Sequence, residues 1–166
     1  MMDELTQKEL DERYMRRAIE LARVAEAEDE VPVGALILHR GEVIAAASNR
    51  REGNKCATHH AEILAIEEAC RVLGGWRLPD CTLYVTLEPC PMCAGAILNA
   101  RIGRVVYGAR DLRAGALGTV LNVNEVAYFH RAEVTGGVLG DECRELLCAY
   151  FREKRAKEKA EKAGEN

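Results

Sequence analysis

Two short motifs constrain this chain more than any other feature, because each stands where a helix should begin. The first is His60-Ala61-Glu62, and the second is Pro89-Cys90-Pro91-Met92-Cys93. Each follows a stretch that is typical of a strand or a loop, so both motifs lie at junctions between secondary-structure elements. Together they place one imidazole, two thiols and one carboxylate at two helix starts.

The apolar pattern predicts helices that alternate with strands. We expect helices over 13–27, 59–73 and 90–99 and a final helix capped by Asp141, with strands at 33–38, 43–47, 82–86, 104–107 and 131–134. The tight turn between the first two strands predicts an antiparallel hairpin. The short connections around the helix 90–99 predict that the strands flanking it are parallel. Thr58 is expected to cap the helix that carries the first motif.

Composition limits the class of protein. The chain has 166 residues, of which 48% are apolar and 30% charged, and these values fit one globular domain. A net charge of −4 argues against binding of polyanions over the whole surface. The acidic start lacks the pattern of a secretory signal, and no apolar run approaches the length of a membrane span. We therefore expect a soluble, cytoplasmic protein without membrane contact.

The cysteines indicate a metal site more than a disulfide framework. Seven cysteines are an odd number, and the chain is large enough for a real core. Cys90 and Cys93 are three residues apart at a helix start, so both sulfurs can reach one ion, and the helix dipole there favours the thiolate form. His60 completes three ligands. A fourth position would remain for a water, whose pKa zinc lowers to about 7.

Glu62 stands two residues after His60 and can reach the water side of such a site. A carboxylate there can take a proton from the water and pass it to a substrate. Two alternatives remain open. Cys90 and Cys93 could form a redox pair of the glutaredoxin type, or Cys56 or Cys81 could close a purely structural zinc site. His59 is expected to point away from the metal.

Longer stretches of the chain resemble a known family. A His-x-Glu motif followed by Pro-Cys-x-x-Cys is the signature of zinc-dependent nucleobase deaminases. From about Arg13 to the basic tail, the chain is similar to the bacterial tRNA-specific adenosine deaminases. The resemblance is carried by EVPVGA at 30–35, SNR at 48–50, THHAEI at 58–63, YVTLEPCPMCAGA at 84–96 and RIGRVVYGARD at 101–111.

This resemblance implies a three-layer α/β/α fold of the cytidine-deaminase type, with a central five-stranded mixed sheet and helices on both faces. It implies a homodimer, one Zn²⁺ per subunit, and conversion of adenosine to inosine at the wobble position of a tRNA anticodon stem-loop. We expect a flexible N-terminal extension at 1–12, the zinc deaminase domain at 13–155 and a charged C-terminal tail at 156–166.

The resemblance also implies roles for single residues. His60, Cys90 and Cys93 would bind zinc, and Glu62 would be the catalytic proton shuttle. Substrate contacts would come from Asn49, Asp111, Phe151 and Arg152. Two positions depart from the family, which usually has Ala where this chain has His59, and Asn where it has Phe129. The second departure bears on recognition of the anticodon loop and leaves the zinc chemistry unchanged.

Other functions compete with this one. A deaminase of a free base or nucleoside, of the guanine or cytosine type, would use the same zinc motifs, because those motifs specify the reaction and not the substrate. Such an enzyme has no need of Asn49, Asp111 and the Phe151-Arg152 pair as RNA contacts. A non-enzymatic zinc or redox module would tolerate the substitution Glu62→Gln.

Overall fold

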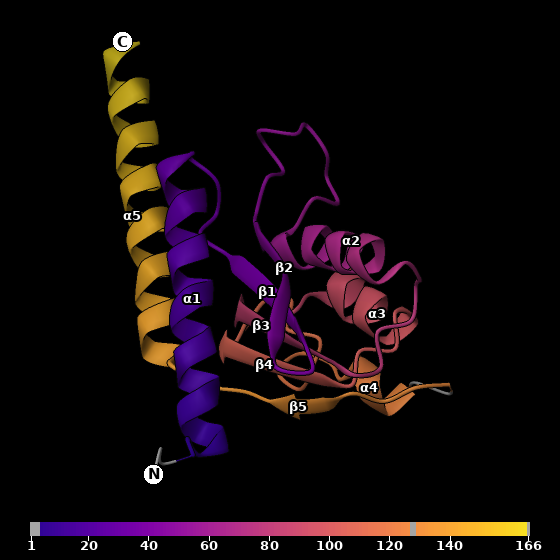
Figure 1. Ribbon diagram of the computed structural model, residues 1–166. Coiled ribbons are helices and arrows are strands. Elements are labelled where there is room, and N and C mark those ends of the chain that lie inside the picture. Colours follow the sequence, from indigo (N-terminus) through magenta and orange to yellow (C-terminus); the bar gives the residue numbers. More distant parts are fainter. Residues whose placement is uncertain (1–3, 127–128, 166) are drawn as a thin grey trace.

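A computed structural model of the protein describes residues 4–126 and 129–165 (Figure 1). The elements in order are α1 (Gln7–Ala27), β1 (Gly34–His39), β2 (Glu42–Ser48), α2 (Ala61–Leu73), β3 (Cys81–Leu87), α3 (Pro91–Asn99), β4 (Arg104–Ala109), α4 (Val123–Val126), β5 (Glu133–Thr135) and α5 (Gly140–Gly164). Apart from the consecutive strands β1 and β2, strands and helices alternate along this chain, and the longest helix comes last.

The five strands form one mixed sheet in the order β2-β1-β3-β4-β5. Strand β1 is antiparallel to both β2 and β3, so the predicted hairpin is confirmed. Strand β4 runs parallel to β3, and β5 runs parallel to β4, so the predicted parallel pair is also confirmed. The carboxyl ends of β3 and β4 therefore meet at the same edge of the sheet, and the loops that follow them are neighbours.

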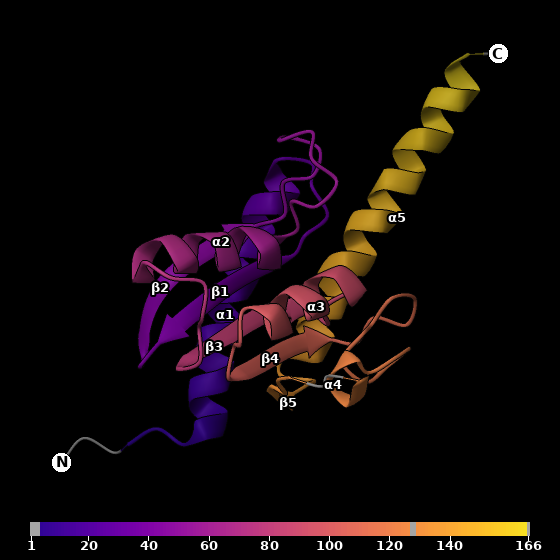
Figure 2. The same ribbon diagram turned by 90° about the vertical axis from the view of Figure 1, so that its right-hand side faces the viewer.

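Helices cover both faces of the sheet, which confirms the predicted three-layer α/β/α fold. Figure 2 looks onto the face covered by α2 and α3, and α1 lies behind the sheet. Alternation along β1 supplies both cores, since successive side chains point to opposite faces. Ala35 and Ile37 belong to the cluster under α2 and α3, whereas Leu36 and Leu38 pack with Met15 and its neighbours on α1.

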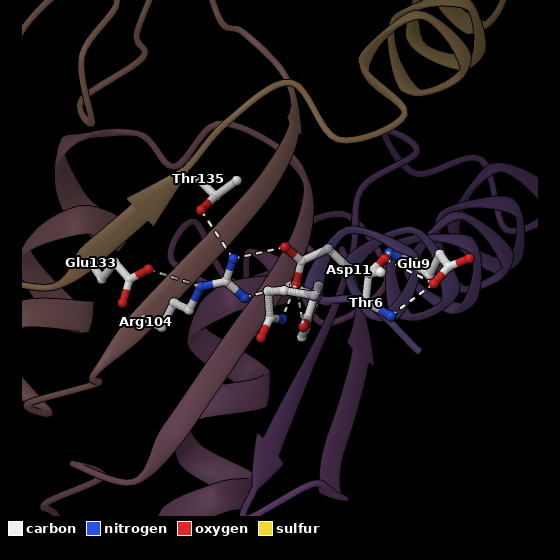
Figure 3. Close-up of polar contacts among 8 residues, drawn as sticks. Thr6, Glu9, Asp11, Arg104, Glu133 and Thr135 are labelled. Carbon is white, nitrogen blue, oxygen red and sulfur yellow. Dashed lines mark hydrogen bonds and ion pairs between the residues drawn. The ribbon is translucent and has the colours of Figure 1, made fainter. Parts of the chain in front are cut away.

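Helix α1 begins before the predicted boundary at residue 13. Thr6 caps it through a reciprocal capping box with Glu9. The expected flexible extension at 1–12 is therefore wrong for residues 7–12, which form the first turns of this helix. The physical reason is Asp11, which is buried against the sheet and binds Arg104 of β4 (Figure 3).

The C-terminal half of the chain also differs in detail from the prediction. Helix α5 continues to Gly164, so most of the expected charged tail is helical, and its far end projects beyond the sheet in both views (Figures 1 and 2). Leu139, not Asp141, is its N-cap. Helix α4 was not predicted, because it spans one turn without an apolar face. No helix of the described ranges is long and apolar enough to cross a membrane.

Candidate active site

Both motifs lie at helix N-termini, beside the edge of the sheet. His60 is the N-cap of α2 and Cys90 is the N-cap of α3, where Pro91 at the first helical position favours a helix start. Neither cap side chain bonds the helix backbone, so imidazole and thiol remain available to a ligand. The expected cap Thr58 is wrong, because His60 occupies that position. The Thr58 hydroxyl lies instead 3.5 Å from Sγ of Cys56.

The structure brings His60, Cys90 and Cys93 together. Their ligand atoms all lie within 4.8 Å of one another. Nδ1 of His60 is 3.7 Å from Sγ of Cys90 and 3.4 Å from Sγ of Cys93. Two ligand atoms on a tetrahedral zinc, at ordinary Zn–N and Zn–S lengths, would be about 3.6 Å apart. The spacing and the one-nitrogen, two-sulfur donor set therefore both fit a zinc ion.

The metal-binding cluster is confined to these three side chains among the residues that the structure describes. Neither Cys56 nor Cys81 joins it. Cys81 is buried at the start of β3, where it pairs with His39 of β1. The described residues therefore offer no fourth protein ligand for a closed structural zinc site. Three protein ligands with one position left over are the arrangement of catalytic zinc sites.

The pKa values of the two thiols are shifted in opposite directions. A hydrogen bond from Cys93, together with the one to His60, lowers the pKa of Cys90 to about 4. The same hydrogen bond to Cys90 and burial raise the pKa of Cys93. The hydrogen bond with Cys90 also raises the pKa of His60. Cys90 is thus already a thiolate at neutral pH, and this is the form that binds a metal.

Glu62 lies in the first turn of α2, beside the cluster, with only 4% of its surface exposed. Burial raises its pKa, and the hydrogen bonds with its own backbone and with Cys93 oppose that rise. A carboxylate with a raised pKa is a stronger proton acceptor than an ordinary one. Its position and its acidity suit proton transfer.

A pocket of about 260 Å³ opens over these groups. Its wall includes three of the four residues expected to contact substrate, namely Asn49, Asp111 and Phe151. Arg152 is not part of the wall, since it lies on the exposed side of α5, with its guanidinium 3.8 Å from Glu145. The other lining residues are Val31, Val33, Arg51, His60, Ala61, Glu62, Leu87, Glu88, Cys90 and Ala114.

Asn49 carries a polar atom that has no partner. Its side chain is buried, and its Nδ2 donates to the carbonyl of Val31 at 3.4 Å, which sets the orientation of the amide. Within the described residues, Oδ1 has no hydrogen-bond partner. A buried acceptor left unpaired costs about 1–3 kcal/mol. A ligand that donates an N–H or O–H to Oδ1 would remove that cost, so Asn49 is suited to contact a substrate in the pocket.

Two buried glutamates that the sequence analysis did not assign hold loops that carry pocket residues. Glu88 accepts hydrogen bonds from the backbone of Leu117 (3.1 Å) and of Thr119 (3.2 Å), and from the Thr119 hydroxyl. It also accepts from the backbone of Asp111 at 3.4 Å. One carboxylate at the end of β3 thus fixes the loop that presents Asp111. Its backbone partners lie 23 to 31 residues away, so no short sequence pattern marks it.

Glu30 has the matching role for the loop that carries Arg51, although it does not line the pocket itself. It is 2% exposed, and Oε1 accepts the backbone N–H groups of Glu52 (2.7 Å) and Gly53 (3.0 Å). The loop that leads from Asn49 to His60 is therefore held at its middle. Nδ1 of His59 lies 2.9 Å from Nδ2 of Asn54, which is within hydrogen-bond distance. His59 is not part of the metal cluster.

Phe129, at the other departure from the family, is in contact with Arg101. The guanidinium of Arg101 sits 4.3 Å from its ring centroid, a cation–π contact. Next to it, His130 hydrogen-bonds the carbonyl of Ile102 at 2.8 Å. Neither residue lines the pocket.

Comparison with known proteins agrees with this geometry. The family model of the MafB19-like deaminases matches residues 9–144. A tRNA-specific adenosine deaminase from Bacillus subtilis (strain 168) is 52% identical over 90% of this chain and 94% of its own length. A solved structure from a study of A-to-I editing by tRNA:A34 deaminases at the wobble position superposes with a TM-score of 0.76. It is 43% identical and covers 81% of this chain and 99% of its own.

A guanine deaminase from Nitrosomonas europaea has nearly the same fold, with a TM-score of 0.75. It is 32% identical, over 84% of this chain and 83% of its own. The fold is therefore shared by enzymes named for different substrates, whereas the higher identities lie with the tRNA enzymes. The chain belongs to the MafB19-like deaminase family and, within it, to the family of the bacterial tRNA-specific adenosine deaminases.

Proposed function

We propose that this protein is a zinc-dependent enzyme that converts adenosine to inosine at the wobble position of a tRNA anticodon. The observation that carries the proposal is the cluster of His60, Cys90 and Cys93 beside the buried Glu62, next to a pocket that His60, Glu62 and Cys90 line. The 52% identity to a tRNA-specific adenosine deaminase over 90% of the chain supports the substrate. A pocket of about 260 Å³ is small for a ligand site, which suits a single base.

The reaction exchanges an amine for an oxygen. Adenosine and water give inosine and ammonia, so one C–N bond breaks at the carbon that carries the amine and one C–O bond forms there. His60, Cys90 and Cys93 would hold a zinc ion, which would supply an activated water for this attack. Glu62 accepts one proton from the water and delivers it to the ring nitrogen. It then transfers the remaining proton, from the newly formed C–OH group, to the departing amine, which leaves as ammonia. Oδ1 of Asn49 accepts a hydrogen bond from the base or its sugar.

The remaining expected contacts are assigned to RNA around the target base. Asp111 and Phe151 line the pocket, so they would meet the target nucleotide or its neighbour. Arg152 and the lysines and arginines beyond it project along α5, where phosphates of the stem could reach them. In this proposal residues 13–155 carry the reaction, and residues 156–166 contribute charge only. The protein would act in the cytoplasm, with its tRNA.

We also propose that the protein works as a homodimer. Apolar side chains are exposed on and after α2, notably Val72 at 52% and Trp76 at 50%. Trp76 lines a shallow hollow between α2 and α3, together with Ile63, Ile66, Cys70 and others. A patch of this kind is typical of a surface that a second subunit covers. Sedimentation at micromolar concentration would test it, with Trp76→Ser as the variant expected to be monomeric.

Deamination of guanine is the second candidate, because a guanine deaminase shares the fold at a TM-score of 0.75. One experiment separates the two. The zinc-loaded protein would be incubated with an anticodon stem-loop that carries adenosine at the wobble position, and separately with free guanine, adenosine and cytidine. We expect inosine in the stem-loop and no conversion of the free compounds. Conversion of guanine with an untouched stem-loop would overturn the substrate and keep the chemistry.

A further inference from the structure

Arg51 occupies a place in the pocket that no role above explains. It is exposed, and it is the only lysine or arginine among the described residues that line the pocket. Within the described chain its guanidinium forms no ion pair and no hydrogen bond with another side chain. A free cation at the mouth of a binding pocket is available to an anionic ligand.

The neighbouring Arg50 shows that this freedom is not general. Its guanidinium is 3.1 Å from Oε2 of Glu28 and also donates to Oε1 of the same carboxylate. Its side chain lines a different hollow, between β2 and α2. Two adjacent arginines thus point to different surroundings: one is neutralised by Glu28, and the other faces the pocket unpaired.

The backbone that presents Arg51 is fixed. The carbonyl of Arg51 accepts the N–H of Cys56 at 3.0 Å, and the next two residues donate their N–H groups to buried Glu30. The N–H of Arg50 donates to the carbonyl of His59, which ties the loop to the start of the first motif. The backbone of Arg51 is therefore fixed relative to the start of the first motif, as a binding residue requires.

The charges of the pocket favour entry of the base of a nucleotide over entry of its phosphate. The pocket lining carries three carboxyl groups, those of the buried Glu62 and Glu88 and that of Asp111, which disfavour an anion beside them. A neutral base can enter, but a phosphate has to stay at the rim. Arg51 lies at that rim, and its loop rises at the same end of the molecule as the projecting half of α5 (Figures 1 and 2).

We propose that Arg51 binds a backbone phosphate next to the target nucleotide and so helps the enzyme select a nucleic acid over a free base. This inference rests on the proposed function, since only a nucleic acid brings a phosphodiester to the pocket. Arg51 is a substrate-binding residue in this proposal, and it contributes nothing to the bond-breaking step. Its loss should therefore weaken binding without slowing the conversion of bound RNA.

The test compares Arg51→Gln with Arg50→Gln on the wobble-adenosine stem-loop, over a range of salt concentrations. For Arg51→Gln we expect KM to rise by about three- to tenfold, which is the effect of losing one partly exposed charge contact. We expect kcat to stay at the wild-type value. The slope of log KM against log salt should fall by about 0.7–0.9, the share of one phosphate. Arg50→Gln should match the wild type in all three, and Arg51→Lys should recover part of the loss.

Uncharged methylphosphonate linkages on either side of the target adenosine identify the contact. One of them should reproduce the loss in the wild-type enzyme and add nothing to Arg51→Gln. Equal KM values and salt slopes for Arg51→Gln and Arg50→Gln would overturn this inference, as would a loss confined to kcat. If the wild-type enzyme leaves the stem-loop unconverted and unbound, the proposed function fails, and this inference fails with it.

Discussion

Arg104 of β4 holds Asp11 of α1 with two hydrogen bonds of 2.7 Å, one to each carboxylate oxygen, across 93 residues of sequence (Figure 3). The Tyr84 hydroxyl donates to the same carboxylate at 2.8 Å. The side chains of Asp11 and Arg104 are 5% and 16% exposed. This network joins the first helix to the centre of the sheet.

Removing one partner of this pair should be costly. Asp11→Asn leaves Arg104 buried without its counter-charge, so we expect the free energy of unfolding to fall by about 3–5 kcal/mol. Urea denaturation would measure it. Glu133→Gln provides the matched control, because Glu133 also contacts Arg104, at 3.5 Å, but is 74% exposed. That control should cost less than about 1 kcal/mol, and equal losses for the two variants would contradict the argument.

Asp11 should also make stability depend on pH in the acid range. Burial works against ionisation of its carboxyl, but the hydrogen bonds from Arg104, Tyr84 and Gln7 outweigh it and lower the pKa below 3.8. Because the folded pKa is the lower one, the contribution of Asp11 is fully present above the unfolded value. It is lost as the pH falls through the folded value.

The measurement is the urea midpoint of wild type and Asp11→Asn between pH 2 and pH 7. The difference between the two proteins should be constant above about pH 4, the unfolded value, and should shrink below it. A difference that instead grows toward low pH would show that Asp11 is protonated in the folded protein.

The site residues that sequence analysis identified share one property: the signal for each is local. His60 and Glu62 are two residues apart, and Cys90 and Cys93 are three apart, so a short pattern contains the chemistry. Helix α1 had a local signal as well. Thr6 and Glu9 have the spacing of a capping box, and this pattern could have placed the helix start correctly.

Glu30 and Glu88 had no comparable pattern. Their partners are backbone N–H groups 22 to 31 residues away, and a backbone group leaves no mark in the sequence. The same holds for Asp11, which looked like one more charge in a polar stretch. Asp11 is buried because β4, 93 residues further along the chain, lies beside α1. The partner of a buried charge depends on the tertiary fold. The apolar periodicity of a single helix therefore does not predict it.

Zinc binding should depend on His60 and not on Cys56. For His60→Ala we expect loss of tightly bound zinc, since two thiols remain and the tetrahedral set is broken. Cys56→Ser should keep one zinc per chain, because Cys56 is outside the cluster. Metal analysis after dialysis would measure both. A zinc loss in Cys56→Ser would instead support a closed structural site.

Glu62→Gln separates catalysis from metal binding. The amide cannot accept and release a proton, so we expect the conversion rate of the stem-loop to fall by about 10²–10⁴-fold. Zinc content should remain at one per chain, because Glu62 is not in the ligand cluster. Single-turnover assays with saturating enzyme would measure the rate of the chemical step. A variant with wild-type rate would point to a non-enzymatic role for the metal.

Gly115 should tolerate no side chain, whereas Gly95 should accept one. A Cβ at Gly115 would lie 2.5 Å from the carbonyl of Asp111 and 2.5 Å from Oε2 of Glu88, so Gly115→Ala has to displace the loop or the carboxylate. We expect KM for the stem-loop to rise while zinc stays bound, because the displaced loop carries Asp111. Gly95 lies in α3, and a Cβ there meets nothing within 4 Å.

Gly95→Ala should stabilise the fold by about 0.5–1 kcal/mol, through the higher helix propensity of alanine. Thermal unfolding and stem-loop kinetics on both variants would check the pair, and an unchanged KM in Gly115→Ala would show that the Glu88-bound loop does not set substrate binding.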